Sequence, residues 1–275
     1  MVHRIRSQDI LRDGFTVIPD VVPRSLIEPA IDAICAWGNF DLDDPNTWYS
    51  NAPENTGIVP LHHGQALWDI RQCPSLYEAF VEIWGDRSLR VSMDRCCFRP
   101  PWRSGEAGVG QGNIHWDADP LGGDPGWVQG TVYLTDVGPD AGGFQCAPPV
   151  FRDLDAWLND HGDTLDRDQP PIGNEDIVQV EGKAGDVVVW HPLLPHGPAP
   201  NHTARPRLSF FVKMDPMPSD RTEVEDRYED AVSWWREKRA PPWWRDLPGQ
   251  QDPEPGPVAD LSPLGRKLIG LDDWG

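Results

Sequence analysis

The stretch that most constrains this chain is His115-Trp116-Asp117. In an extended strand, side chains two positions apart point to the same face of the sheet. A strand around His115 would therefore present an imidazole nitrogen from His115 and a carboxylate oxygen from Asp117 to one metal ion. A second histidine from another segment would complete the set of two histidines and one carboxylate that binds iron(II) on one side and leaves the other side open.

A candidate for that second histidine follows a buried strand. The residues from Gly185 to Gly197 read as a turn, an apolar strand over 186–190 and a loop that ends at His196. We therefore assign His115, Asp117 and His196 as the predicted metal ligands and as the catalytic residues.

Further residues accompany these three in a fixed order. They are Gly185-Asp186, His191-Pro192-Leu193-Leu194, His196-Gly197, Asn201, Thr203 and Arg207. In type and order this set resembles the phytanoyl-CoA dioxygenase family of iron(II)- and 2-oxoglutarate-dependent oxygenases, and residues 13–19 resemble the usual opening of that family. The resemblance spans roughly residues 8 to 215. It implies that Fe(II) is the metal and that 2-oxoglutarate and dioxygen (O2) are the co-substrates.

The resemblance also assigns residues to the co-substrate. Arg207 matches the family position that holds the C5 carboxylate of 2-oxoglutarate, where a guanidinium fork can bind both oxygens. Ser209, two residues further along the same strand face, adds a hydroxyl donor. Asn113, two residues before His115, and Thr131, on a later strand, are predicted as further polar contacts to 2-oxoglutarate. A role in the core or in the sheet ladder explains Asn113 and Thr131 equally well.

Two rival ligands remain. His191 could replace His196, but the family pattern puts His191 at the end of the preceding strand, which favours a structural role. Asp119 could replace Asp117, but it lies about 6.6 Å further along an extended chain. Asp119 also precedes a proline, which is typical of a turn.

Other candidate residues have simpler explanations. Arg205 either contacts the substrate or is solvated. His62 and His63 fall in a loop and are expected at the surface. Trp116 should point to the face of its strand opposite His115 and pack there.

Many short strands without helical crossovers predict an antiparallel sandwich or barrel. With the order of the metal ligands, this favours a mostly β fold with flanking helices around a double-stranded β-helix core, the cupin-like jelly-roll. We expect a single domain over 1–275. Its parts are a helical and loop region over 1–88, the jelly-roll catalytic core over 89–215 and a Trp/Pro-rich extension over 216–275.

Local patterns predict the individual elements. Ser7 and Ser25 are expected to cap the first two helices. Gly14 is expected to end the first helix, and Gly85 is expected to end the helix over 75–84. Helical spacing also covers 67–70, 75–84, 151–161 and residues around 228–235. Strand patterns cover 15–18, 89–100, the residues around His115, 127–137, 142–148, 177–180, 186–190 and 208–214.

The charge and the cysteines exclude several classes of function. A formal net charge of −20 opposes approach to nucleic acid or to an anionic membrane. No run of 18 apolar residues occurs, and the first residues are not followed by the apolar core of a signal peptide. Five cysteines without CxxC spacing favour reduced thiols over a disulfide framework or a zinc knuckle. We expect a cytoplasmic protein and make no prediction of its oligomeric state.

Together these patterns predict a dioxygenase that hydroxylates or otherwise oxidises a small organic molecule, a secondary or small metabolite, and releases succinate and CO2. Related halogenases carry Ala or Gly where this chain has Asp117, so hydroxylation, desaturation or ring formation is favoured over halogenation. An acyl-CoA substrate would need several basic residues near the pocket mouth, which the charge disfavours. One alternative is a jelly-roll isomerase or hydrolase with Zn(II) or Mn(II), against which the Arg207-x-Ser209 pair argues. The other is a non-catalytic binding module, against which the complete ligand set argues.

Overall fold

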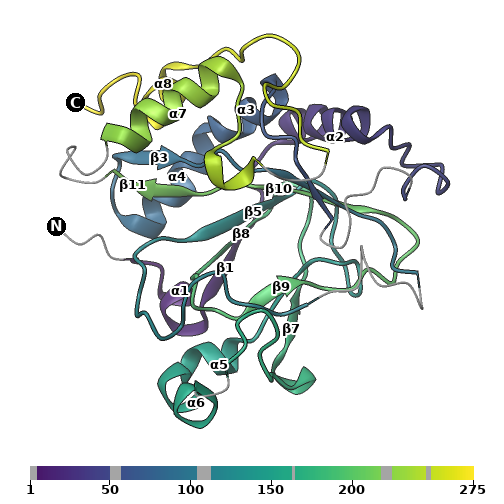
Figure 1. Cartoon of the computed structure of the whole chain (residues 1–275), viewed down its shortest axis with the longest axis vertical. Coiled ribbons are helices and arrows are strands. Elements are labelled where there is room, and N and C mark those ends of the chain that lie inside the picture. Colours follow the sequence, from purple (N-terminus) through teal and green to yellow (C-terminus); the bar gives the residue numbers. More distant parts are fainter. Residues whose placement is uncertain (1–4, 50–56, 104–112, 163–164, 218–224, 246–248) are drawn as a thin grey trace.

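A six-stranded antiparallel sheet forms the centre of the molecule in the computed structural model (Figure 1). The structure describes residues 5–49, 57–103, 113–162, 165–217, 225–245 and 249–275. The order of strands in the sheet is β1-β8-β5-β10-β4-β2. Their bounds are β1 Phe15–Ile18, β8 Val187–Trp190, β5 Gln129–Tyr133, β10 Arg207–Phe211, β4 Cys96–Arg99 and β2 Ile58–Val59.

Two smaller antiparallel sheets complete the β structure. The first has the order β7-β6-β9, with bounds Val178–Val180, Phe144–Cys146 and His196–Pro198. The second pairs β11, Met214–Pro216, with β3, Leu89–Val91. The prediction of an antiparallel β core with flanking helices is confirmed. The region over 1–88 contributes strands β1 and β2 to the central sheet as well as helices and loops.

Helices surround the sheets. They are α1 Gln8–Asp13, α2 Arg24–Gly38, α3 Gln65–Arg71, α4 Pro74–Trp84, α5 Pro148–Arg152, α6 Leu154–His161, α7 Glu225–Glu237 and α8 Pro263–Leu268, with 3-10 turns η2 Asn174–Asp176 and η4 Pro242–Trp244. Ser7 caps α1 as predicted, and its hydroxyl accepts from the Ile10 N–H. The predicted Ser25 cap is wrong, because α2 already begins at Arg24 after an extended Pro23. Among the described residues, no helix is long and apolar enough to cross a bilayer.

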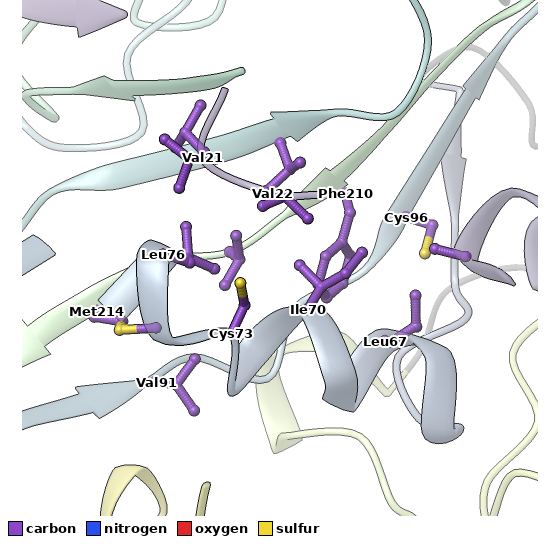
Figure 2. Close-up of a cluster of buried hydrophobic side chains, with 14 of the residues drawn as sticks. Val21, Val22, Leu67, Ile70, Cys73, Leu76, Val91, Cys96, Phe210 and Met214 are labelled. Atoms are coloured by element: carbon purple, nitrogen blue, oxygen red, sulfur yellow. The ribbon is translucent and has the colours of Figure 1, made fainter. Parts of the chain in front are cut away.

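The main core lies between the central sheet and helices α3 and α4. Leu67 and Ile70 of α3 pack in one buried cluster with Phe210 of β10 and Leu76 of α4 (Figure 2). Burying each of these side chains stabilises the fold by about 1.5–3 kcal/mol. Because side chains alternate along a strand, the neighbours of Phe210 on β10 point to the opposite face. That face of the sheet carries the site described below.

Three predicted strands differ in the structure. The strand over 208–214 is divided into β10 and β11, which belong to different sheets. The strand over 89–100 is divided into β3 and β4, which belong to different sheets. The strand around His115 is reduced to one antiparallel bridge between His115 and His196, with hydrogen bonds of 2.8 and 3.0 Å. The next amide, Trp116 N–H, donates instead to the carbonyl of Arg167. His196, predicted at the end of a loop, begins strand β9.

The expected surface position of His62 and His63 is wrong. Their residues are 1% and 3% exposed. The carboxylate of Glu254 accepts both backbone N–H groups, at 2.7 and 3.1 Å, and lies 2.6 Å from Nδ1 of His62. Burial, with His62 alongside, lowers the pKa of His63 to about 3, so this imidazole is neutral. The error arises because Glu254 lies far away in the sequence and gives no local signal.

Candidate metal centre

Three side chains from two segments meet at the bridge between His115 and β9. One ligand atom each of His115, Asp117 and His196 lies within 4.8 Å of the others. Nε2 of His115 is 3.5 Å from Oδ1 of Asp117, and Nε2 of His196 is 3.4 Å from Oδ2. Two imidazole nitrogens and one carboxylate oxygen are the donor set typical of non-haem iron(II) sites. These three residues therefore fit iron(II).

Contacts behind His196 fix the orientation of its ring. Its Nδ1 donates to the carbonyl oxygen of Leu194 at 2.8 Å, which leaves the lone pair of Nε2 facing Asp117. The rings of Phe144 and Trp190 pack against the imidazole, with centroids 5.8 and 5.2 Å away. A ligating histidine normally uses its second nitrogen in this way.

Asn113 occupies the corresponding position behind His115. Its side-chain amide lies 3.1 Å from Nδ1 of His115. When Nε2 of the His115 ring binds a metal, the neutral ring carries its proton on Nδ1. A rotation of about 180° of the Asn113 side-chain amide puts its oxygen in the place of its nitrogen, where the oxygen accepts a hydrogen bond from this N–H. The structure therefore places Asn113 against the imidazole, where it can orient the ring.

Gln129 holds the carboxylate, and the sequence analysis missed it. At the start of β5, its Nε2 donates to Oδ2 of Asp117 at 2.5 Å, while its Oε1 accepts from Nε1 of Trp190 at 2.8 Å. Partial burial raises the pKa of Asp117, but the adjoining imidazoles of His115 and His196 and the hydrogen bond from Gln129 outweigh this, and the pKa lies well below its ordinary value. The signal in the sequence was a long polar side chain at the start of a strand that is otherwise mostly apolar.

Replacing Gln129 with leucine is expected to weaken Fe(II) binding about 10- to 100-fold, because the carboxylate of Asp117 loses the donor that orients it. Anaerobic calorimetric titration with Fe(II) measures this effect. Gln179→Leu is the matched control, since Gln179 is an exposed strand glutamine on β7 whose side chain accepts only from Asp140 N–H among the contacts described. Equal affinities in the two variants would remove Gln129 from the site.

Arg207 and Ser209 lie side by side on β10, facing the same cavity as the three ligands. Nη1 of Arg207 donates to the Ser209 hydroxyl at 2.6 Å, and its Nε donates to the Gly142 carbonyl at 2.8 Å. Two of the five N–H groups of a guanidinium are thereby used, which leaves a fork of the outer nitrogens for an anion. Both side chains are buried, so such a contact would be shielded from water.

A second buried arginine, also missed from the sequence, lies opposite Arg207. Arg99 is its register partner across β4 and β10, so both side chains share one face of the sheet. Burial, with Arg207 as a like-charged neighbour, lowers the pKa of Arg99 to about 10. Both arginines line the cavity, which gives this part of it a positive character that suits a dicarboxylate.

The cavity has a volume of about 1190 Å³. Its wall includes all three predicted ligands, together with Arg207, Ser209, Gln129 and Asn113. Thr131 also lines it, but its hydroxyl donates to the Phe210 carbonyl at 3.3 Å, which is a sheet-ladder contact. The cavity therefore brings together the three candidate metal ligands, a buried arginine whose outer N–H groups can bind an anion, and space for a further ligand.

The rival residues lie elsewhere. His191 is buried, its Nδ1 accepts from Leu193 N–H at 3.1 Å, and it is absent from the described cavity wall. Asp119 accepts from Leu121 N–H, as a turn residue does. Arg205 pairs with Asp43 at the surface. Trp116 is buried and donates to the Leu193 carbonyl, in the packing role expected for it.

Gly197 allows β9 to approach the His115 segment, because a Cβ there would overlap the carbonyl oxygen of Asn113. Gly197→Ala is expected to push His115 and His196 apart, lowering the free energy of unfolding by about 1–3 kcal/mol and weakening Fe(II) binding. Thermal unfolding and Fe(II) titration measure the two effects. Gly138→Ala is the control, since a Cβ on Gly138 meets nothing within 4 Å. Wild-type behaviour of Gly197→Ala would contradict the role of this close approach.

Comparisons with known proteins agree on one family. The model of the phytanoyl-CoA dioxygenase (PhyH) family matches residues 10–209. A Dictyostelium discoideum protein named "Putative phytanoyl-CoA dioxygenase" is 22% identical over 265 residues, covering 74% of this chain and 73% of that protein.

Solved structures share the fold at low sequence identity. GlcNAc Inducible Gene 2 of Candida albicans has a TM-score of 0.71 and 13% identity, with 97% of this chain and 76% of that one covered. The epimerase SnoN, crystallised with Fe3+, alpha ketoglutarate and nogalamycin RO, has a TM-score of 0.51 and 16% identity, with 92% and 93% covered.

Proposed function

Because the chain belongs to the phytanoyl-CoA dioxygenase family, we propose that it is an Fe(II)- and 2-oxoglutarate-dependent dioxygenase that oxidises a small organic molecule. The observation that carries this proposal is the meeting of His115, Asp117 and His196 in the same cavity as Arg207. The metal donors and a buried arginine beside them suit an iron centre with a dicarboxylate co-substrate.

The proposed fold around the site is the double-stranded β-helix, or jelly-roll. The six-stranded sheet and the β7-β6-β9 sheet would form its two halves. Arg207 belongs to the first sheet and His196 to the second, and both side chains line the one cavity. This arrangement supports a site enclosed between two antiparallel sheets.

The chain's residues would hold the metal and the co-substrate in fixed positions. His115, Asp117 and His196 are the proposed metal ligands. When iron is bound, it supplies the oxidative decarboxylation of 2-oxoglutarate by O2, which yields succinate and CO2 and oxidises the substrate. Trp190 and Gln129 keep the Asp117 carboxylate turned toward the two imidazoles.

Arg207 and Ser209 would bind the distal carboxylate of 2-oxoglutarate. The outer nitrogens of Arg207 offer a fork for two oxygens, and Ser209, which accepts from Arg207, has its own hydroxyl proton left to donate. Asn113 and Thr131 remain proposed polar contacts at the side of the co-substrate, and the Thr131 hydroxyl would have to exchange its bond to the Phe210 carbonyl for one to 2-oxoglutarate. Asn113 would serve mainly by orienting His115.

The residues also favour hydroxylation, desaturation or ring formation over halogenation and over non-redox chemistry. Asp117 provides a carboxylate at the position where related halogenases have Ala or Gly. A non-redox isomerase or hydrolase would have no use for the buried pair Arg207 and Ser209. The wall of the cavity leaves room for a small organic substrate beside the metal donors.

The test is an anaerobic titration of the apoprotein with Fe(II) and 2-oxoglutarate. A visible charge-transfer band that requires both components is expected, followed by succinate formation when O2 is admitted. Omitting iron, 2-oxoglutarate or O2 in turn should abolish succinate. Turnover without iron, or bound iron without the band, would contradict the proposal and favour non-redox chemistry.

A further inference from the structure

The cavity that holds the proposed metal centre extends to the C-terminal segment. Its wall includes Trp234 of α7, Trp243 and Trp244 of η4 and Leu268 of α8. Helix α8 packs against strand β3. In Figure 1, α7 and α8 lie above β3 and β11, whereas β9, which carries His196, lies on the other side of the central sheet in that view. The segment therefore encloses a part of the cavity remote from His196.

Besides that of Trp190, four indole rings line the cavity, three of them from the C-terminal segment. Trp127, Trp234, Trp243 and Trp244 all line the cavity, and we call them the aromatic compartment. Trp234 and Trp243 meet edge to face, with centroids 5.3 Å apart and planes at 90°. Trp234 is 8% exposed, whereas Trp243 is 58% exposed, which places Trp243 where the compartment opens to solvent.

Two cations that line the cavity beside the aromatic compartment, Arg95 and Lys213, already have partners among the described residues. Arg95 donates to Asp94 at 3.1 Å, and its guanidinium lies 3.4 Å from the ring centroid of Trp244. Nζ of Lys213 lies 3.0 Å from Asp215 and 4.3 Å from the ring centroid of Trp127. Each cation thus has a carboxylate partner and supports an indole ring. Neither is left to bind the phosphate of a ligand.

The C-terminal segment is fixed to the body by specific contacts. Glu254 accepts the backbone N–H groups of His62 and His63. Nζ of Lys238, just after α7, donates to the carbonyls of Glu254 and Gly256 at 2.7 and 2.6 Å. The aromatic compartment is therefore preformed, as a binding site usually is.

We propose that the aromatic compartment binds the uncharged, ring-bearing part of the substrate, so that the substrate class is a neutral aromatic or fused-ring molecule. This rests on the proposed function for the reaction itself. The cavity of about 1190 Å³ exceeds the roughly 300–1,000 Å³ that encloses a drug-sized ligand. It therefore has room for such a molecule as well as 2-oxoglutarate. Indole walls favour a flat ring by apolar burial and edge-to-face contacts.

The test uses 2-naphthol as a neutral two-ring probe, with 2-naphthoate and decanoyl-CoA as charged competitors. Binding is measured by calorimetry on the full chain, both metal-free and loaded anaerobically with Fe(II) and 2-oxoglutarate. We expect 2-naphthol to bind both forms. In the form loaded with Fe(II) and 2-oxoglutarate, where the co-substrate occupies Arg207, we expect 2-naphthoate and decanoyl-CoA to bind at least about tenfold more weakly, because Arg95 and Lys213 beside the compartment already have partners and do not compensate the desolvation of the added charge.

Trp243→Ala should weaken 2-naphthol binding about tenfold or more, and Trp243→Phe should retain affinity within about threefold. Trp235→Ala is the matched control on the same segment, because its indole donates to the Ala259 carbonyl and is absent from the described cavity wall. This control should keep both 2-naphthol binding and succinate formation.

Three results would overturn the inference. They are no binding of 2-naphthol, equal binding in Trp243→Ala, and displacement by equimolar decanoyl-CoA. Failure of the proposed function is a separate outcome, because it removes the Fe(II)/2-oxoglutarate band and succinate formation. The metal-free binding of 2-naphthol would still report on the compartment.

Discussion

Asp117→Ala is expected to abolish succinate formation and to weaken Fe(II) binding at least about 100-fold. The substitution removes the single anionic donor among the three proposed ligands, so two neutral imidazoles remain to compete with water for the metal. It also leaves Nε2 of Gln129 without its acceptor. Anaerobic Fe(II) calorimetry and succinate assays with 2-oxoglutarate measure the two losses.

Asp119→Ala provides a control with the same chemical change two residues away. Asp119 accepts from Leu121 N–H in a turn and is absent from the described cavity wall. Its loss should leave Fe(II) affinity and turnover within about twofold of the wild type, as for a surface substitution. If Asp119→Ala lost the metal and Asp117→Ala kept it, the assigned carboxylate would be wrong.

Arg207→Ala is expected to raise the KM for 2-oxoglutarate about 100-fold or more while Fe(II) affinity stays near that of the wild type. Removing one partner of a buried, charged hydrogen bond costs about 2–5 kcal/mol, which corresponds to roughly 30- to several thousand-fold in affinity. Arg207→Lys keeps the charge but loses the fork, so an intermediate KM is expected. Kinetics at varied 2-oxoglutarate and a separate Fe(II) titration distinguish the two parameters.

Arg205→Ala is the matched control for Arg207→Ala. Arg205 lies two residues earlier and pairs with Asp43 at the surface, so its loss should leave both parameters unchanged. A parallel fall in Fe(II) affinity and 2-oxoglutarate affinity in Arg207→Ala would indicate a structural role. That outcome would remove Arg207 as the proposed carboxylate anchor.

Features of the fold that depend on short stretches were predictable from the sequence. The Ser7 cap and the Gly14 end of α1 are local, and the structure reproduces both. The predicted strand over 89–100 was wrong because β3 and β4 pair with different partners, β11 and β10. Such a division is set by contacts between distant segments, so the alternation of apolar residues cannot reveal it.

The candidate site shows the same division between local and distant information. His115 and Asp117 are two residues apart, and their spacing alone suggested a shared metal, which the structure supports by bringing His196 to them. Gln129 was missed because its contact with Trp190 depends on the register of β5 against β8, and its contact with Asp117 depends on how the His115 segment lies beside β5. The tryptophans of η4 could not be placed against the cavity from the sequence, since their position depends on how the C-terminal segment docks.

The Glu254 contacts also determine when the protein can finish folding during its synthesis. They join residues 192 and 191 positions apart in the chain. A ribosome releases the N-terminal part first, and contacts of such high contact order form late. The backbone N–H groups of His62 and His63 therefore lack their carboxylate partner until Glu254 has left the ribosomal exit tunnel. The wall that would recognise substrate is consequently the last part of the cavity to be assembled.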